Sequence, residues 1–542
     1  MRTTKKILFI NIVLVLIFVP SFSPNRFVFS EENDPIDFLF EESNYAEITE
    51  DTEIDHYFEI PFGATLLVKK GVTLTFNGGE IGVLGKIVFK GTVKKPIILK
   101  KAPGAPNYFV SSNNGGEIEM RNVDVSGGGS NEPPPVIIGD KSIWKNANAL
   151  GPRGAIDIPR GKLVAEGCDF HNNEIAVSFG FYNSETRINR SKFSQNSVYD
   201  IMASPYNFNL KYNWWGSENG PDMEKILGNA DYSDWAKSKN FHDPVILIPG
   251  ILGSQKKDEK WEMDPIFHTY DELEKTFEKN GYVKDRDLFV FPYEWRDSNV
   301  ENALKLKDRI NEIKAAVKWP KVDLVAHSMG GLMSRSYIES EYYQDDVDQL
   351  VTMGTPHRGS PKSYPTWEAG ELLTPSGIID VLADKIFKQE AKENGYSSIF
   401  EYIRKRPMDS VRELLPNYDY LFSVSDNLMR KYPNFYPVNL FLDDLNSESN
   451  LKKLEKVEFT NIYGIMDDEK STITSIQVGE PSSVSGSVWE HGFPEDYDSF
   501  SGDHGLSKGK GDETVPLESS TGIPSDDKME AKNIVHGNLP KE

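Results

Sequence analysis

The stretch VDLVAHSMGG, Val322 to Gly331, has the residue types of an activated nucleophile. An apolar run that predicts a buried strand leads into Ser328 and then into a pair of glycines. A serine on a sharp turn between strand and helix has its hydroxyl raised above the carboxyl end of a sheet, where it can attack a carbonyl carbon. Ala326 stands where glycine is usual and adds one methyl group. The setting between an apolar strand and the helix pattern GLMSRSYIES predicts Ser328 as the nucleophile.

A serine hydroxyl needs a base, and the base needs a carboxylate that fixes its tautomer. For a nucleophile in this setting the chain order is serine, then acid, then histidine. Asp512 lies in the glycine-rich segment GKGDETVP, and only one histidine, His536, lies beyond it. We therefore predict a triad of Ser328, Asp512 and His536, with Asp467 or Asp468 as the rival acid after the apolar segment NIYGIM.

The same chemistry needs backbone N–H donors for the oxyanion that forms during attack on a carbonyl. One donor is normally the amide after the nucleophile, here Met329. The other comes from the loop after the first core strand, which places it at Ile251, directly after PVILIPG. His327 is expected to pack beside the turn rather than act as a second base.

The elements that must position these residues begin at about Asp243, where short apolar strands alternate with helical patterns and predict a doubly wound α/β domain. Apolar strands are expected within 244–250, 322–326, 348–356 and 459–467. Val300, Leu304, Ile310, Ile313 and Val317 fall mostly on one face of an expected helix. A long helical stretch with aromatic residues predicts a cap at about 361–445, inserted over the sheet. Trp261, Phe267 and Tyr270, with apolar cap residues from Ile378 to Leu382, are candidates either for an acyl groove or for ordinary cap core.

Residues 55–220 have short alternating strands and no helical period. Phe170, Phe193 and Trp214 recur at intervals of 23 and 21 residues, and Val125 lies two such periods before Phe170. A period in the low twenties with one inward apolar side chain per rung is typical of a parallel β-helix, and a β-sandwich is the alternative. The segment YNWWGSENGP also resembles the closing segment of right-handed β-helix repeat domains in exported microbial proteins.

Composition and the first residues of the chain bear on location and partners. Sixty basic and eighty-three acidic side chains give a net charge of -23, which opposes nucleic-acid binding. Arg2, Lys5 and Lys6 precede thirteen mostly apolar residues and the segment PSFS, a pattern typical of an export signal, with a retained N-terminal anchor as the alternative. The single cysteine, Cys168, excludes an intramolecular disulfide. We expect an exported, extracellular or cell-surface protein.

The predicted organisation is multidomain: an N-terminal right-handed parallel β-helix is followed by a C-terminal α/β-hydrolase with an inserted helical cap. The expected boundaries are a signal peptide or anchor at 1–29, an acidic linker at 30–54, the β-helix at 55–220, a linker at 221–242 and the hydrolase at 243–542.

Six segments together, from about Asp243 to the C-terminus, resemble the lecithin:cholesterol acyltransferase family of α/β-hydrolases. In order they are PVILIPGILGS, FPYEWRDS, VDLVAHSMGGL, MGTPHRGSP, GDETVP and the terminal HGNLP. The resemblance implies a triad at Ser328, Asp512 and His536, with oxyanion amides at Ile251 and Met329. It also implies a disulfide-braced lid in animal members, which this chain cannot form, so Gln255 to Tyr270 must be ordered in another way.

The function implied is that of an exported serine acyl hydrolase or O-acyltransferase acting on lipid esters, without cofactor or metal. The final acceptor, water or an alcohol, and the oligomeric state stay open. The β-helix is expected to contact a cell surface or polysaccharide. Two alternatives remain: an esterase for non-lipid, polysaccharide esters, and a surface adhesion or glycan-binding protein with an inactive hydrolase domain.

Overall fold

The computed structural model divides into two compact units, residues 1–241 and 242–542. The N-terminal segment with the predicted export signal, the loop Gly127 to Pro135 and the residues Phe267 and His504 lie outside the described residues. The described residues are 40, 43–92, 94–106, 110–111, 116–126, 136–140, 143–145, 155–158, 162–179, 186–203, 208–239, 242–265, 268–317, 319–371, 378–406, 408–482, 486–496 and 505–542.

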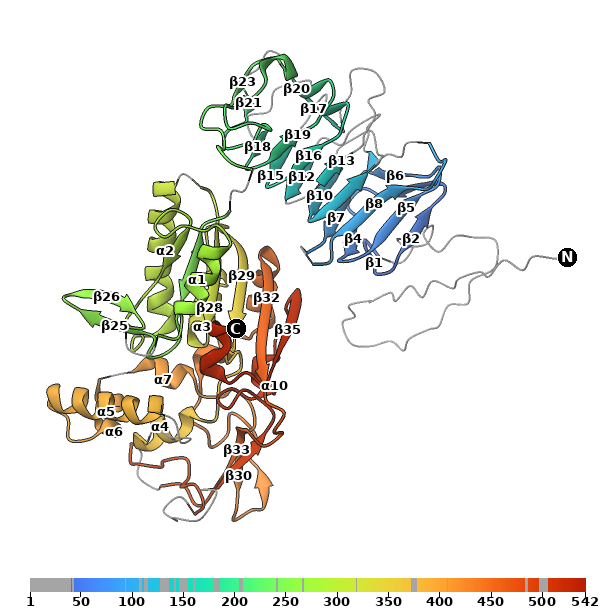
Figure 1. The fold of residues 1–542 in the computed structure, drawn as a ribbon. Coiled ribbons are helices and arrows are strands. Elements are labelled where there is room, and N and C mark those ends of the chain that lie inside the picture. The colour runs from blue at the N-terminus through green and yellow to red at the C-terminus, as the bar shows by residue number, and fades with distance from the viewer. Residues whose placement is uncertain are drawn as a thin grey trace, which may run out of the picture. The chain divides into compact units, whose positions relative to one another are not determined.

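The first unit consists of parallel strands from successive stretches of chain (Figure 1). The longest sheet has the order β1 (Tyr45–Ile48), β4 (Thr65–Lys69), β7 (Lys86–Lys90), β10 (Glu117–Arg121), β12 (Val136–Asp140), β15 (Lys162–Glu166), β18 (Arg187–Asn189), β21 (Phe208–Asn209) and β23 (Ala230–Asp231). A second sheet has the order β19 (Lys192–Ser194), β16 (Asp169–His171), β13 (Ile143–Lys145), β11 (Val123–Ser126), β8 (Ile97–Lys101), β5 (Thr73–Phe76) and β2 (Thr52–Ile54).

Two shorter parallel sheets complete this unit. One contains β3 (Tyr57–Ile60), β6 (Glu80–Val83) and β9 (Val110–Ser111), and the other contains β14 (Ile156–Ile158), β17 (Ile175–Phe179), β20 (Tyr199–Ala203) and β22 (Ile226–Leu227). The short helix η2 (Met223–Lys225) precedes β22. The described inward side chains of these sheets share one apolar core.

The register of the strands explains the sequence period. Val125 is paired with Trp144 in the next strand, and Trp144 with Phe170, so Val125 lies two strands before Phe170 as predicted. Phe170 is in turn paired with Phe193, and their rings stack at 5.0 Å. The prediction for Trp214 is wrong by one residue, because the buried ring that stacks on Phe193 at 4.7 Å is that of Trp215.

The second unit is built on a six-stranded parallel sheet, which confirms the α/β class. Its order is β27 (Leu288–Val290), β24 (Val245–Ile248), β28 (Val322–His327), β29 (Val347–Met353), β32 (Glu458–Ile465) and β35 (Asp527–Lys532). All residues of β24 and β28 are buried, because a parallel sheet with helices on its faces has no solvated side.

Three longer helices outside the cap accompany this sheet: α1 (Asp271–Lys279), α2 (Asn299–Val317) and α3 (Met329–Ile338). The predicted apolar face of α2 is partly wrong, since Val300 and Leu304 are exposed. The apolar residues that the helix buries are instead Ala303, Leu306, Ile310 and Ile313. Ala303, a small residue, therefore faces the core where the sequence pattern predicts the larger Leu304. An antiparallel hairpin, β25 (Ser254–Lys257) with β26 (Lys260–Met263), orders the predicted lid region.

The cap forms from two stretches of chain on either side of β32, and it lies below the central sheet in Figure 1. The first stretch contains α4 (Ser363–Ala369), α5 (Ile378–Glu393), α6 (Ile399–Lys405), α7 (Asp409–Glu413), β30 (Leu421–Ser423), β31 (Leu428–Met429), α8 (Leu440–Leu445), α9 (Glu448–Leu451) and η3 (Lys452–Lys456). The second contributes β33 (Thr472–Val478) and β34 (Leu506–Gly509), which complete a sheet of order β31-β30-β33-β34.

The remaining short elements are α10 (Leu517–Ser520) and η4 (His536–Lys541), on either side of β35. Within the described part of the chain, no helix combines the length and the apolar character needed to cross a membrane.

Candidate active site

Ser328 occupies the turn between β28 and α3, at the carboxyl end of a central strand. Its φ of 53° and ψ of -124° fall in a region that non-glycine residues rarely adopt. The turn is fixed on both sides, because the Ser328 amide donates to the Met353 carbonyl and the Thr355 hydroxyl donates to the Ser328 carbonyl. This strained strand–serine–helix turn is the nucleophile elbow of α/β-hydrolases.

Close backbone approach around the elbow explains two glycines. A Cβ at Gly330 would lie 2.6 Å from the Pro249 carbonyl oxygen, so only glycine lets α3 begin this close to β24. A Cβ at Gly250 would lie 2.7 Å from the Cβ of Ser328. The backbone that follows β24 therefore lies directly against the nucleophile.

His536 contacts both other members of the predicted triad. Its Nε2 lies 2.9 Å from the Ser328 Oγ, and its Nδ1 lies 2.8 Å from the Asp512 Oδ2. Since a carboxylate only accepts, Nδ1 carries the hydrogen and Nε2 is left to accept the serine proton. This is the tautomer that a general base needs.

The acid is held in place by backbone donors. Asp512 is 1% exposed, and its Oδ1 accepts the amides of Val515 at 2.7 Å and Thr514 at 3.1 Å. The His536 amide donates to the Asp512 carbonyl, so the two loops are also joined through the backbone. The rival acids Asp467 and Asp468 are exposed, and Asp467 is bonded to the Asn533 side chain.

The two predicted oxyanion donors flank Ser328. Met329 is the first residue of α3, and a helix leaves the amide of its first residue without a carbonyl partner inside the helix. Ile251 follows Gly250, whose backbone lies against Ser328, in a turn closed by the Gly253 amide on the Gly250 carbonyl. Both amides therefore belong to segments that border the nucleophile.

Two side chains beside the elbow have more contacts than the sequence indicated. Tyr270 is 5% exposed, and its hydroxyl lies 2.9 Å from both the Gly250 amide nitrogen and the His327 Nδ1. The His327 Nε2 lies 3.0 Å from the backbone carbonyl of His536. Tyr270 is thus a buried, hydrogen-bonded residue rather than part of an apolar groove. Its partner is 57 residues away in the chain, a separation that no local pattern reveals.

The remaining described histidines of this unit that follow Ser328 belong to other networks. His357 is fully buried beside Arg335, and burial lowers its pKa well below the usual range. His491 bonds to the buried carboxylate of Glu368 in the cap. Neither is hydrogen-bonded to Ser328.

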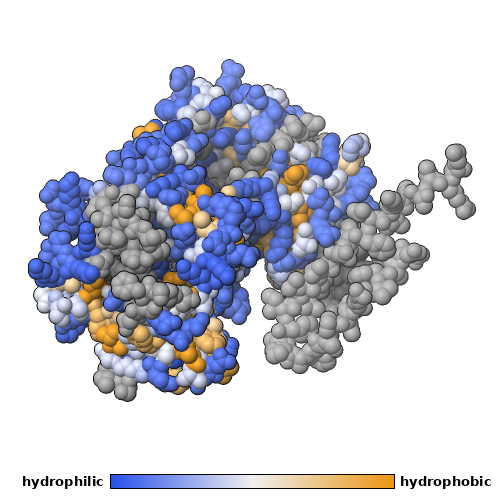
Figure 2. All heavy atoms as spheres, turned by 60° about the horizontal axis from the view of Figure 1, so that its bottom comes forward, coloured by the Kyte–Doolittle hydropathy of each residue, from blue (hydrophilic) through white to orange (hydrophobic). Residues whose placement is uncertain are grey.

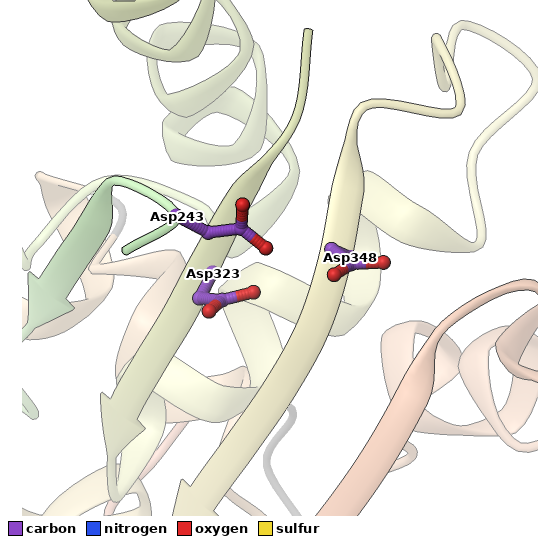
Figure 3. Close-up of side chains that lie close together, drawn as sticks. All are labelled: Asp243, Asp323 and Asp348. Atoms are coloured by element: carbon purple, nitrogen blue, oxygen red, sulfur yellow. The ribbon is translucent and has the colours of Figure 1, made fainter. Parts of the chain in front are cut away.

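Three carboxylates at the opposite end of the strands could offer metal ligands. Asp243, Asp323 and Asp348 have carboxylate oxygens within 4.8 Å of one another (Figure 3). Asp323 accepts both the backbone and the side-chain amide of Gln349, and Asp243 accepts the Trp319 indole N–H. They lie at the amino ends of the strands whose carboxyl ends border Ser328, so they take no part in the triad.

Several large apolar side chains of the cap are exposed. Figure 2, in which the bottom of Figure 1 comes forward, shows apolar groups interspersed with polar ones on this face. The exposed large apolar residues of the cap are Val424, Leu428, Met429, Phe435, Leu440 and Val488. These side chains add apolar area to the surface of the cap.

Part of this unit is similar to a known family of proteins. Residues 263–416 match the family model described as lecithin:cholesterol acyltransferase. A phospholipase A(1) of Arabidopsis thaliana is 29% identical over 129 residues, which are 21% of this chain and 29% of that protein. The human (Homo sapiens) lysosomal phospholipase A and acyltransferase is 25% identical over 151 residues, 26% of this chain and 36% of that protein.

Other matches have related descriptions. A GPI inositol-deacylase of Phaeosphaeria nodorum is 24% identical over 190 residues, covering 30% of this chain and 18% of that protein. Among solved structures, the mature lipase BlEst2 of Bacillus licheniformis matches with a TM-score of 0.31 and 16% identity, over 55% of this chain and 86% of that one. The matched regions span well under half of the three curated relatives.

Proposed function

We propose that residues 242–542 are a serine acyl hydrolase or O-acyltransferase that acts on lipid esters. The observation that carries this proposal is the continuous chain of hydrogen bonds from Asp512 through His536 to the Ser328 hydroxyl. The match of residues 263–416 to an acyltransferase family and the apolar surface of the cap support a lipid ester as substrate.

The proposed reaction has two acyl-transfer steps. Ser328 Oγ attacks the ester carbonyl while its proton passes to His536 Nε2, and the amides of Ile251 and Met329 stabilise the oxyanion. His536 then returns the proton to the leaving alcohol, and an acyl-enzyme remains. Water or a second alcohol, deprotonated by His536, attacks the acyl-enzyme and releases Ser328. Asp512 keeps the imidazole in the required tautomer throughout.

Labelling with a fluorophosphonate tests the nucleophile. We expect the full chain to be labelled at Ser328 and the Ser328→Ala variant to be unlabelled. Ser340→Ala is a matched control, because this serine lies just after the same helix, where its hydroxyl donates to the Tyr337 carbonyl; it should label like wild type. Equal labelling of wild type and Ser328→Ala would contradict the proposal.

A second assay distinguishes hydrolysis from transfer. The full chain is incubated with mixed phospholipid and neutral lipid vesicles, with and without an added long-chain alcohol, and both free fatty acid and new ester are measured. Fatty acid alone indicates a lipase or phospholipase, and new ester that depends on Ser328 indicates an acyltransferase. Cleavage of short acetyl esters without cleavage of long-chain esters would favour the alternative of a polysaccharide esterase.

We further propose that the parallel sheets of residues 43–239 form a right-handed parallel β-helix that contacts a cell surface or polysaccharide. Successive strands pair in parallel at the period of the sequence repeat, and inward rings stack between them, which supports the first part. An experimental structure in which these sheets face each other as a sandwich would contradict it. Co-sedimentation of the Ser328→Ala full chain with insoluble polysaccharide tests the contact.

Export stays a prediction from Arg2, Lys5, Lys6 and the apolar residues that follow. We propose that the protein acts outside the cytoplasm. Recovery of the full chain from the culture medium of an expressing cell, with its N-terminus sequenced, distinguishes a cleaved signal from a retained anchor. Recovery only from the cytoplasm would contradict export.

A further inference from the structure

Tyr270 and His327 join the two loops on which the proposed reaction depends. One loop is the turn Gly250–Gly253, which contains Ile251, and its Gly250 amide is bonded to the Tyr270 hydroxyl. The other loop holds His536, whose backbone carbonyl lies 3.0 Å from the His327 Nε2. Between them, the Tyr270 hydroxyl and the His327 Nδ1 are 2.9 Å apart. The contacts form one unbroken series from the oxyanion turn to the general base.

The direction of every bond in this series follows from elementary chemistry. Burial lowers the pKa of His327 to about 3, so the ring is neutral and carries one hydrogen. The His536 carbonyl only accepts, which places that hydrogen on His327 Nε2. His327 Nδ1 must then accept from the Tyr270 O–H, and the Tyr270 oxygen is free to accept from Gly250 N–H. Every hydrogen-bond donor in the series therefore faces an acceptor.

The turn at the start of this series needs such support. Leu252 has a φ of 63°, which costs energy for a residue with a branched side chain. The packing around it is tight, because a Cβ at Gly253 would lie 2.7 Å from the Pro249 Cβ and 3.2 Å from the Tyr270 hydroxyl. A strained turn stays in place only when surrounding contacts hold it, and the Tyr270 hydroxyl is one of these contacts.

We propose that Tyr270 and His327 are positioning residues that hold the oxyanion turn and the His536 loop at a fixed separation around Ser328. This inference rests on the proposed function and adds the two residues to it. Neither residue touches the reacting atoms in this scheme; they act through the Ile251 amide and the His536 ring. Because oxyanion donors are effective only when held in advance where charge develops, loosening the turn should reduce the rate of the chemical step more than substrate binding.

The test uses the full chain and a soluble ester, p-nitrophenyl butyrate, with kcat and KM measured separately. Tyr270→Phe removes the bonds to Gly250 and His327, and we expect kcat to fall about 10-fold with KM within about two-fold, less than loss of an oxyanion donor itself. His327→Leu removes the bonds to Tyr270 and His536 and should lower kcat at least as much.

Two further variants separate positioning from general loss of packing. His327→Gln keeps an N–H that can donate to the His536 carbonyl, so it should recover part of the kcat lost in His327→Leu. The double variant Tyr270→Phe with His327→Leu should be no slower than His327→Leu alone, because both changes interrupt one series. If His327→Leu does not fold, the same test of additivity in kcat can be made with Tyr270→Phe, His327→Gln and their double variant.

Tyr337→Phe is the matched control. Tyr337 is as deeply buried as Tyr270, and its hydroxyl donates to Asp346 at 2.6 Å, away from the Ser328 site. We expect it to lower Tm without lowering kcat. The inference is overturned if wild type is active and Tyr270→Phe behaves like Tyr337→Phe, or if the effects on kcat multiply independently. Absence of Ser328-dependent hydrolysis in wild type would instead overturn the proposed function, and the inference with it.

Discussion

The two ends of the same parallel strands gather acidic side chains in different ways. At the amino ends, the Asp323 carboxylate accepts the backbone amide of Gln349 at an irregularity where β29 has one residue more than β28. At the carboxyl ends, Asp512 also accepts backbone amides with one oxygen, but its other oxygen faces His536. The comparison indicates that a carboxylate becomes part of a catalytic arrangement through the group that its second oxygen faces, rather than through burial or proximity to other acids.

The largest effect should follow from loss of the base at the carboxyl end. His536→Ala leaves Ser328 without a proton acceptor, and we expect kcat for a soluble ester to fall by about 10⁵ to 10⁶-fold. His171→Ala, in the other unit, should leave kcat unchanged. A decrease of less than ten-fold for His536→Ala would mean that another group activates Ser328.

Asp512→Asn should lower kcat by about 10⁴-fold, because an amide in place of the carboxylate favours the wrong tautomer of His536. The folded state should be kept, as checked by thermal unfolding. Asp467→Asn is the matched control, since Asp467 was the rival acid in the sequence and is exposed in the structure. A larger loss for Asp467→Asn than for Asp512→Asn would reverse the assignment.

Gly250→Ala should lower kcat by about 100-fold, because its Cβ would lie 2.7 Å from the Ser328 Cβ and displace the oxyanion turn or the nucleophile. Gly537→Ala adds the same methyl group beside His536, where no atom lies within 4 Å, and kcat should be unchanged. Equal values of kcat for the two variants would show that the turn tolerates displacement.

A substitution at the amino end of the sheet should change the stability of the protein but not its kcat. Asp323→Ala leaves the Gln349 amides without their acceptor, and we expect the free energy of unfolding to fall by about 1 to 3 kcal/mol. Urea unfolding measures this loss, and kcat at a temperature where the variant is folded should stay within about two-fold of wild type. A ten-fold loss of kcat would mean that the two ends of the strands are coupled.

Much of the second unit was predictable because its signals are local. The apolar run before Ser328 and the small residues after it are consecutive in the chain, and they indicated strand, turn and helix correctly. The choice between Asp512 and Asp467 was not local, since both lie in loop segments, and only the three-dimensional path of the chain brings one of them to His536. The hydrogen bond between Tyr270 and His327 could not be predicted for the same reason, because a bond between distant residues leaves no pattern in either segment.

In the first unit the length of the repeat was predictable, but which of two adjacent tryptophans faces the core was not. Trp214 and Trp215 are adjacent, and the spacing of the repeat differs by only one residue between them. Trp214 lies outside the named strands and forms an isolated bridge with Lys192, so strand alternation could not select the inward ring. Similarly, the predicted cap at 361–445 does not include β33, which comes after β32 in the chain although it pairs with β30 from before β32.

That shared cap sheet limits how the chain can be re-engineered. A chimera that replaces only residues 361–445 would remove β30 and β31 while leaving β33 and β34 behind, so both halves would expose unpaired strand edges. Such edges promote aggregation. The low yield of the chimera could then be attributed wrongly to the choice of the relative that supplied the inserted segment. Transfer of substrate preference between relatives therefore requires exchange of both segments at once, with β32 kept as the recipient's own strand.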